Sequence, residues 1–163
     1  MVYFTVLLLL FPALSFAEVY LSPQEAIKNI FPDYQEYKTQ TYAVGQHKVR
    51  VFRIFKDTKL FGWAVVLNEK GLKDPITFLV GIDTKGKVLD VYVLEYLEPH
   101  GFNIRERPFM KQFQGKSIES PLTIGQDIDG VTHATISSKA AVVAVRESLQ
   151  VVNDLSKRFI CVK

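Results

Sequence analysis

Residues 76–97 read ITFLVGIDTKGKVLDVYVLEYL, and this stretch decides the fold class. Residues 83–86 are polar and end in glycine, which predicts a tight turn, and residues 88–97 continue with Val and Tyr as a strand. Before the turn, alternate apolar positions place four side chains on one face of another strand: Ile76, Phe78, Val80 and Ile82. Two strands joined by a short turn form a hairpin, so we expect an antiparallel sheet.

The residues before this hairpin predict a helix and a further strand. Residues 22–25, SPQE, have the capping-box pattern with proline at the first helical position, and apolar residues follow at helical spacing until Pro32. Residues 60–67 are rich in aromatic and β-branched residues, which is typical of a strand. The apolar positions of residues 39–55 fit a strand or a helix, and the sequence leaves that choice open.

The residues after the hairpin lead to a long C-terminal helix. Residues 108–114 predict one or two helical turns that Gly115 ends. Ser137 suits the N-cap of the last helix, whose apolar residues recur at steps of three and four: Ala141, Val142, Val145, Leu149 and Val152. We therefore predict an α+β fold, a small antiparallel sheet with an N-terminal helix and a long C-terminal helix packed on it.

The first 17 residues form an apolar block without Asp, Glu, Lys or Arg. Small residues at Ser15 and Ala17 fit a signal-peptide cleavage site before Glu18, and the block is shorter than the roughly 20 residues that span a bilayer. A short retained anchor is the alternative. Both interpretations place residues 18–163, expected to form a single domain, outside the cytoplasm: in the periplasm or on the outer face of the cytoplasmic membrane.

Composition argues against several classes of protein. The chain has 20 Lys and Arg against 17 Asp and Glu. This excess of positive charge is small and scattered, so it does not form the basic patch that is typical of nucleic-acid binding. Cys161 is the only cysteine, so no internal disulfide is expected. His47, His100 and His133 do not share a metal-ligand spacing, and no hydrolase nucleophile motif is present. We therefore expect neither a metal site nor a catalytic residue.

Residues 127–138, DIDGVTHATISS, contain the main candidate functional residues. They resemble the flavinylation motif of the FMN-binding domain family, which includes the G subunit of Rnf complexes and the C subunit of sodium-pumping NADH:quinone oxidoreductases. The motif of that family is an Asp followed, after two residues, by Ser or Thr, Gly, Ala and Thr. The corresponding residues here are Asp129, Thr132, His133, Ala134 and Thr135.

Further landmarks of the family follow one another in the same order across about residues 60–155. They are Gly62-Trp63-Ala64, the strand Pro75–Asp83, residues 93–101 with Glu98-Pro99-His100-Gly101, and Phe113-Gln114-Gly115-Lys116. The resemblance implies an electron carrier with FMN bound covalently by a phosphoester to Thr135. It also implies a separate magnesium-dependent flavin transferase that uses FAD, and a membrane redox complex or an exported redox protein as partner.

Other residues are expected to surround this cofactor. A phosphate on Thr135 would lie near the first N–H groups of the last helix, where the hydroxyls of Ser137 and Ser138 could also donate. The resemblance implies that the loop of Glu98, His100 and Gly101 lines the isoalloxazine ring.

His133 departs from the family, which prefers Gly at this position. A glycine there suggests that the backbone needs a positive φ, a conformation that His tolerates better than branched residues do. The substitution leaves an alternative open: a binding or interaction module of the same fold that is flavin-free or holds FMN without a covalent bond.

Overall fold

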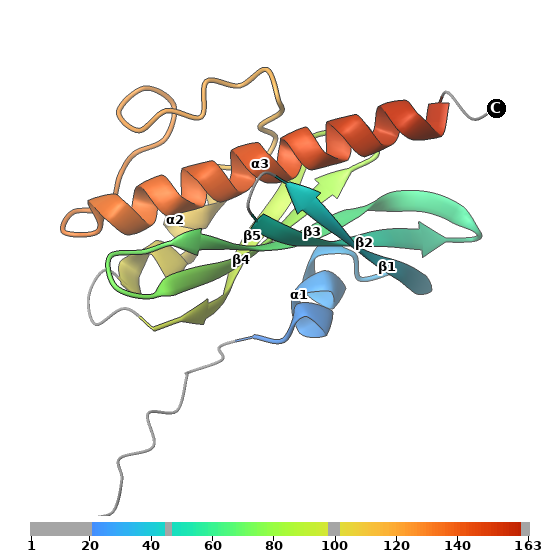
Figure 1. Cartoon of the computed structure of the whole chain (residues 1–163), viewed down its shortest axis with the longest axis horizontal. Helices are drawn as coiled ribbons and strands as arrows, with labels where there is room; N and C mark the ends of the chain where they lie inside the picture. The colour runs from blue at the N-terminus through green and yellow to red at the C-terminus, as the bar shows by residue number, and fades with distance from the viewer. Residues whose placement is uncertain (1–20, 45–46, 98–101, 161–163) are drawn as a thin grey trace, which may run out of the picture.

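The structure, a computed structural model, describes residues 21–44, 47–97 and 102–160, so the predicted export segment and Cys161 lie outside the described residues. Five strands are framed by helices in chain order (Figure 1). The elements are α1 (Pro23–Ile30), β1 (Glu36–Val44), β2 (His47–Lys56), β3 (Lys59–Lys70), β4 (Pro75–Asp83), β5 (Val88–Tyr96), the 3-10 helix η1 (Phe102–Arg105), α2 (Arg107–Lys111) and α3 (Thr135–Ile160).

The five strands form one antiparallel sheet in the order β1-β2-β3-β4-β5. The predicted hairpin is β4 and β5: the side chain of Asp83 accepts hydrogen bonds from the N–H groups of Lys85 and Lys87, and Gly86 has φ 76°. Residues 39–55, which the sequence left open, are strand apart from 45–46, which are not described. The predicted α+β class is confirmed.

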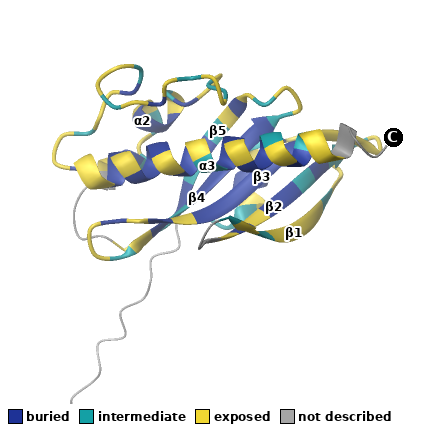
Figure 2. Cartoon of the chain, turned by 45° about the horizontal axis from the view of Figure 1, so that its top comes forward, coloured by how far each residue is buried: buried dark blue, intermediate teal, exposed yellow. Residues whose placement is uncertain are grey.

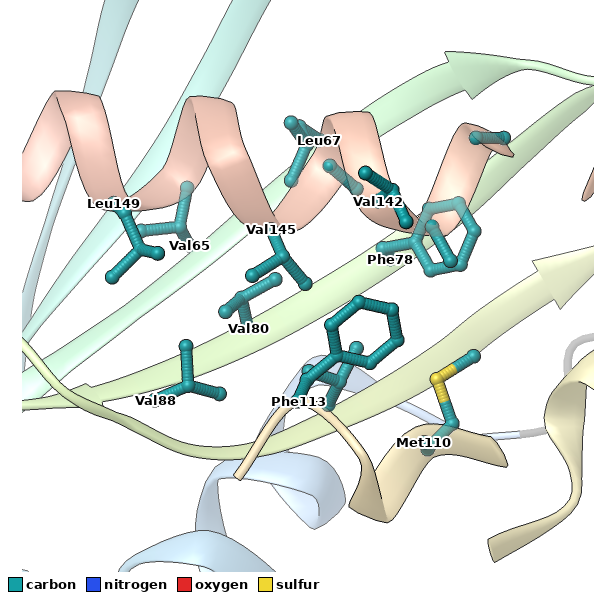
Figure 3. Close-up of a cluster of buried hydrophobic side chains, with 14 of the residues drawn as sticks. Val65, Leu67, Phe78, Val80, Val88, Met110, Phe113, Val142, Val145 and Leu149 are labelled. Atoms are coloured by element: carbon teal, nitrogen blue, oxygen red, sulfur yellow. The ribbon is translucent and has the colours of Figure 1, made fainter. Parts of the chain in front are cut away.

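The sheet has a helix on each face. α3 lies along one face (Figure 1), and buried and exposed residues alternate along it (Figure 2). Its buried residues belong to the core that it shares with the sheet. Figure 3 shows this core, where Val142, Val145 and Leu149 of α3 meet Val65 and Val80 of the sheet. A second core on the opposite face packs α1 against the sheet through Ala26, Ile27 and Phe31.

α1 begins as the sequence predicted and packs closely on the sheet. The side chain of Ser22 accepts from the N–H of Glu25, whose carboxylate accepts from the N–H of Ser22. A Cβ on Gly62 would lie 2.5 Å from a ring carbon of Phe31, and a Cβ on Gly81 would lie 2.7 Å from a side-chain carbon of Ile30. The two glycines therefore allow the end of α1 to approach β3 and β4.

The start of α3 corrects one prediction. Ser137 was expected to cap this helix, whereas the helix begins at Thr135, and the N–H of Ser138 already donates to the carbonyl of Ala134 at 2.8 Å. The side chain of Ser137 is instead buried, with its hydroxyl 3.2 Å from that of Tyr96. Although α3 is long, none of the described helices is sufficiently long and apolar to cross a membrane.

Candidate functional site

The motif begins at a well-anchored carboxylate, that of Asp127. It accepts hydrogen bonds from the backbone N–H groups of Leu122 and Thr123 at 3.2 and 2.7 Å, and from Lys116 Nζ at 2.8 Å. Lys116 Nζ also donates to the carbonyl of Asp127 at 3.2 Å. The hydrogen bond from Lys116, followed by that from Thr123, lowers the pKa of the Asp127 carboxyl below its ordinary value.

Two residues later, a glutamine side chain holds the backbone of Asp129. The N–H of Asp129 donates to Gln112 Oε1 at 2.7 Å, and Gln112 Nε2 donates to the carbonyl of Asp129 at 3.2 Å. Gln112 follows the last residue of α2, so this short helix positions the motif residue. Asp129 itself is exposed, and its carboxylate makes no hydrogen bond or ion pair within the described part of the chain.

Residues 131–134 turn the chain into α3. The N–H of Ala134 donates to the carbonyl of Val131 at 3.0 Å, and the N–H of Val131 donates to Ser138 Oγ at 3.1 Å. His133 lies in this turn with φ 62°, so the position does adopt the left-handed conformation for which the family's glycine is suited. The turn buries Ala134 and leaves Thr132 and His133 exposed.

Thr135, the predicted attachment residue, is the first residue of α3 and is exposed. The first N–H groups of a helix have no acceptor within it and form the positive end of the helix dipole. A phosphate bonded to Thr135 would therefore meet both a favourable field and available donors. Ser137 and Ser138, also predicted to serve the phosphate, are buried, and their hydroxyls contact Tyr96 and the Val131 N–H.

The predicted ring-lining residues Glu98, His100 and Gly101 lie outside the described residues, although the residues on either side are described. Tyr96, at the end of β5, contacts Ser137 of α3, and the guanidinium of Arg105 in η1 lies 5.8 Å from the centre of the Tyr96 ring. The segment before residues 98–101 therefore contacts the first turn of α3, and the segment after them contacts Tyr96.

An open groove lies beside the motif, between η1 and α2 on one side and residues 129–131 on the other. Its volume is about 450 Å³. The groove combines polar and apolar side chains, since it is lined in part by Asn103, Glu106, Phe109, Gln112, Asp129 and Val131. Such a mixture is typical of small-molecule sites. Among the described residues, no group of three His, Cys, Asp or Glu could hold a metal ion.

The sequence did not point to Gln112, Lys116 or Tyr96 as residues of this site. Lys116 belonged to a family landmark and Tyr96 to a predicted strand, but neither had an assigned role. Their contacts with the motif join residues 11 to 41 positions apart, which no local pattern reveals.

Two comparisons with known proteins bear on this region. Residues 71–150 match the family model described as the FMN-binding domain. The chain is also 31% identical, over 103 residues, to the G subunit of the proton-translocating ferredoxin:NAD(+) oxidoreductase complex of Clostridium ljungdahlii. That alignment covers 58% of this chain and 55% of the relative, so the chain spans about half the length of the curated protein that it matches. The matched residues 71–150 include β4, β5, α2 and the whole motif.

Proposed function

We propose that this protein, whose residues 71–150 match the FMN-binding domain, holds its FMN covalently through a phosphoester at Thr135 and relays electrons outside the cytoplasm. The predicted resemblance to the FMN-binding domain family is confirmed by the family match, which supports FMN binding. The covalent bond to Thr135 goes beyond what the family match supports. It is supported chiefly by one observation: Thr135 is exposed at the start of α3, within the motif.

The residues around Thr135 fit a flavin phosphate. The backbone N–H groups of the first turn of α3 are suited to a phosphate, and no acidic side chain occurs between Gly130 and Arg146 to repel it. Exposed Thr132 and His133 precede the attachment residue and leave its surroundings open to solvent. A cofactor tethered there would lie next to the residues that line the groove.

Attachment requires a second protein, because an unassisted threonine hydroxyl is a weak nucleophile. We propose a magnesium-dependent flavin transferase with FAD as the donor. The hydroxyl oxygen of Thr135 bonds to the phosphorus of the FMN half, the pyrophosphate P–O bond breaks, and AMP leaves. The hydroxyl proton passes to a base of the transferase. The tether keeps the cofactor with a protein that has left the cytoplasm.

The proposed role in electron transfer is inferred from the relative and from the apolar residues 1–17. Bound FMN would supply the redox chemistry, by accepting and releasing electrons. The relative's name describes one subunit of a proton-translocating oxidoreductase complex, so we propose a membrane-bound donor and a further redox protein as acceptor. The apolar residues 1–17 support export through a signal peptide or a short anchor.

The test is production of the chain with and without a flavin transferase in an export-competent host. Intact mass should rise by one FMN less one water only with the transferase, and peptide mass spectrometry should place the addition on Thr135. Thr135→Ala should lose the addition, and Thr135→Ser should keep it because the hydroxyl remains. Thr84→Ala, at an exposed threonine of the β4–β5 turn outside the motif, is the matched control. Covalent flavin in Thr135→Ala would contradict the proposed attachment.

The same preparations test the rival function, a module without covalent flavin. If flavin absorbance disappears when denatured wild-type protein is filtered, the domain holds FMN without a bond to the chain. If the absorbance is never present, the protein is a flavin-free interaction module of this fold.

A further inference from the structure

Gln112 makes a pair of hydrogen bonds that few side chains can make. Its amide oxygen accepts from the Asp129 N–H at 2.7 Å while its amide nitrogen donates to the carbonyl of the same residue at 3.2 Å. A side-chain amide carries one acceptor and one donor group at its end, which matches the two polar groups of a single backbone residue. Gln112 therefore fixes both the position and the orientation of Asp129.

The support behind Gln112 is rigid. Phe109 and Met110 of α2 and the following Phe113 are buried in the core on the α3 face, as Figure 3 shows for Met110 and Phe113. The rings of Phe109 and Phe113 also pack edge to face with their centres 5.6 Å apart. Because the core already fixes the backbone of this segment, only the rotamer entropy of the Gln112 side chain is lost when it binds the motif.

The motif is held on either side of Asp129 as well. Lys116 binds the carboxylate and carbonyl of Asp127, and Ser138 Oγ accepts from the N–H of Val131. The backbone of residues 127–131 is thus fixed at three points by side chains from outside it. The carboxylate of Asp129, by contrast, has no bonding partner within the described part of the chain and is exposed.

We propose that Gln112 is a positioning residue for flavin attachment, which holds Asp129 so that its carboxylate and the Thr135 hydroxyl form one preformed surface for the flavin transferase. The inference rests on the proposed function, because it concerns how the attachment residue is recognised. It implies that the transferase acts on the folded domain. Gln112 contacts neither the cofactor nor the reacting oxygen, and it acts through the backbone of Asp129.

The test compares Gln112→Met with a matched control, Gln35→Met. Gln35 makes a similar pair of bonds far from the motif, since its side chain accepts from the Asp57 N–H at 2.8 Å and donates to the Asp57 carboxylate at 3.1 Å. Met keeps the length of Gln and removes both hydrogen-bonding groups. The rate of FMN attachment is measured with FAD and Mg²⁺ against the concentration of the folded domain.

We expect Gln112→Met to raise the KM of the transferase for the domain about tenfold, as the loss of one or two hydrogen bonds implies, with kcat unchanged. Gln35→Met should leave both constants unchanged. Gln112→Glu should fall between wild type and Gln112→Met, because its carboxylate accepts from the Asp129 N–H but cannot donate to the carbonyl. Hydrogen exchange should show faster exchange of the Asp129 amide in Gln112→Met and no change in the slowest amides of the sheet.

The outcomes separate this inference from the proposed function. If the wild-type domain takes no FMN at Thr135 from the transferase, the proposed function is wrong. If the wild type is modified and Gln112→Met has the same KM, only the positioning role is wrong. The chain can also be unfolded at a urea concentration in which the transferase stays active. If FMN is attached equally well to this unfolded chain and to the folded domain, recognition of a preformed surface is wrong.

Discussion

The hydroxyl oxygens of Tyr96 and Ser137 lie 3.2 Å apart in the interior of the protein. Tyr96 is the last residue of β5, and Ser137 belongs to the first turn of α3. Their contact therefore joins the end of the β4–β5 hairpin to the helix that begins at Thr135. Buried hydroxyl groups are costly when they have no partner, so this pair favours one placement of the helix start.

Tyr96→Phe tests that relationship. The substitution keeps the ring and leaves the Ser137 hydroxyl without its tyrosine partner, so we expect the free energy of unfolding to fall by about 1 kcal/mol. Urea denaturation measures the change. Ser137→Ala and the double variant complete a cycle, in which the two losses should not add. Additive losses would show that the two hydroxyls do not interact.

The helix start also shows where sequence patterns stop being informative. Ser137 has the side chain of an N-cap residue, but its hydroxyl faces Tyr96, 41 positions earlier in the chain. The sequence left residues 39–55 open between helix and strand, and the packing of β2 explains why. β2 is covered on both faces, with Val49 and Val51 in one core and Phe52 and Ile54 in the other, so the apolar residues show no clean alternation.

The resemblance of the motif to the FMN-binding domain family pointed to Thr135 and to a left-handed backbone at the position of His133. In the structure Thr135 is exposed at the start of α3, and His133 has φ 62°. The support from Gln112 and Lys116 did not follow, because these side chains bind backbone groups of Asp129 and Asp127, and almost any backbone could offer such groups. Which backbone they meet depends on how α2 packs against the sheet.

Gly62→Ala should destabilise the protein through the packing of α1. The added carbon would lie 2.5 Å from a Phe31 ring carbon and 2.7 Å from the backbone oxygen of Ile82, and the latter cannot move without disturbing β4. We expect a loss of about 1 to 3 kcal/mol in the free energy of unfolding, measured by urea denaturation. Gly81→Ala should cost less, since its nearest neighbours are side-chain atoms of Ile30. The reverse order would contradict the assignment of the strain to the backbone.

Asp127 should make stability depend on acidity. Lys116, and then the Thr123 N–H, lower the pKa of this carboxyl in the folded protein, so its contribution is present above the unfolded-state pKa of about 4. The contribution is lost as the pH falls through the lower folded-state pKa. Asp127→Asn should thus be less stable than wild type at pH 7, and the gap should narrow below about pH 4.

Urea unfolding across this range measures the gap between wild type and Asp127→Asn. Lys116→Met removes the same ion pair from the other side, and it should reproduce much of the loss at neutral pH. A gap that stays constant with pH would mean that the carboxylate charge is not what stabilises the turn.

His133→Gly should stabilise the domain, against the general rule that glycine weakens a fold. The φ of 62° at His133 lies in the left-handed region, where a residue with a Cβ is strained by roughly 1 kcal/mol and glycine is not. Glycine loses more chain entropy on folding than histidine does, which offsets part of this gain. We therefore expect urea denaturation to show a rise of somewhat less than this amount in the free energy of unfolding. His133→Ala separates the two causes, because alanine removes the ring and keeps the Cβ. If alanine stabilises as much as glycine, the strain lies in the imidazole contacts and not in the backbone. If only glycine does, the turn before Thr135 needs the conformation that the family's own residue supplies.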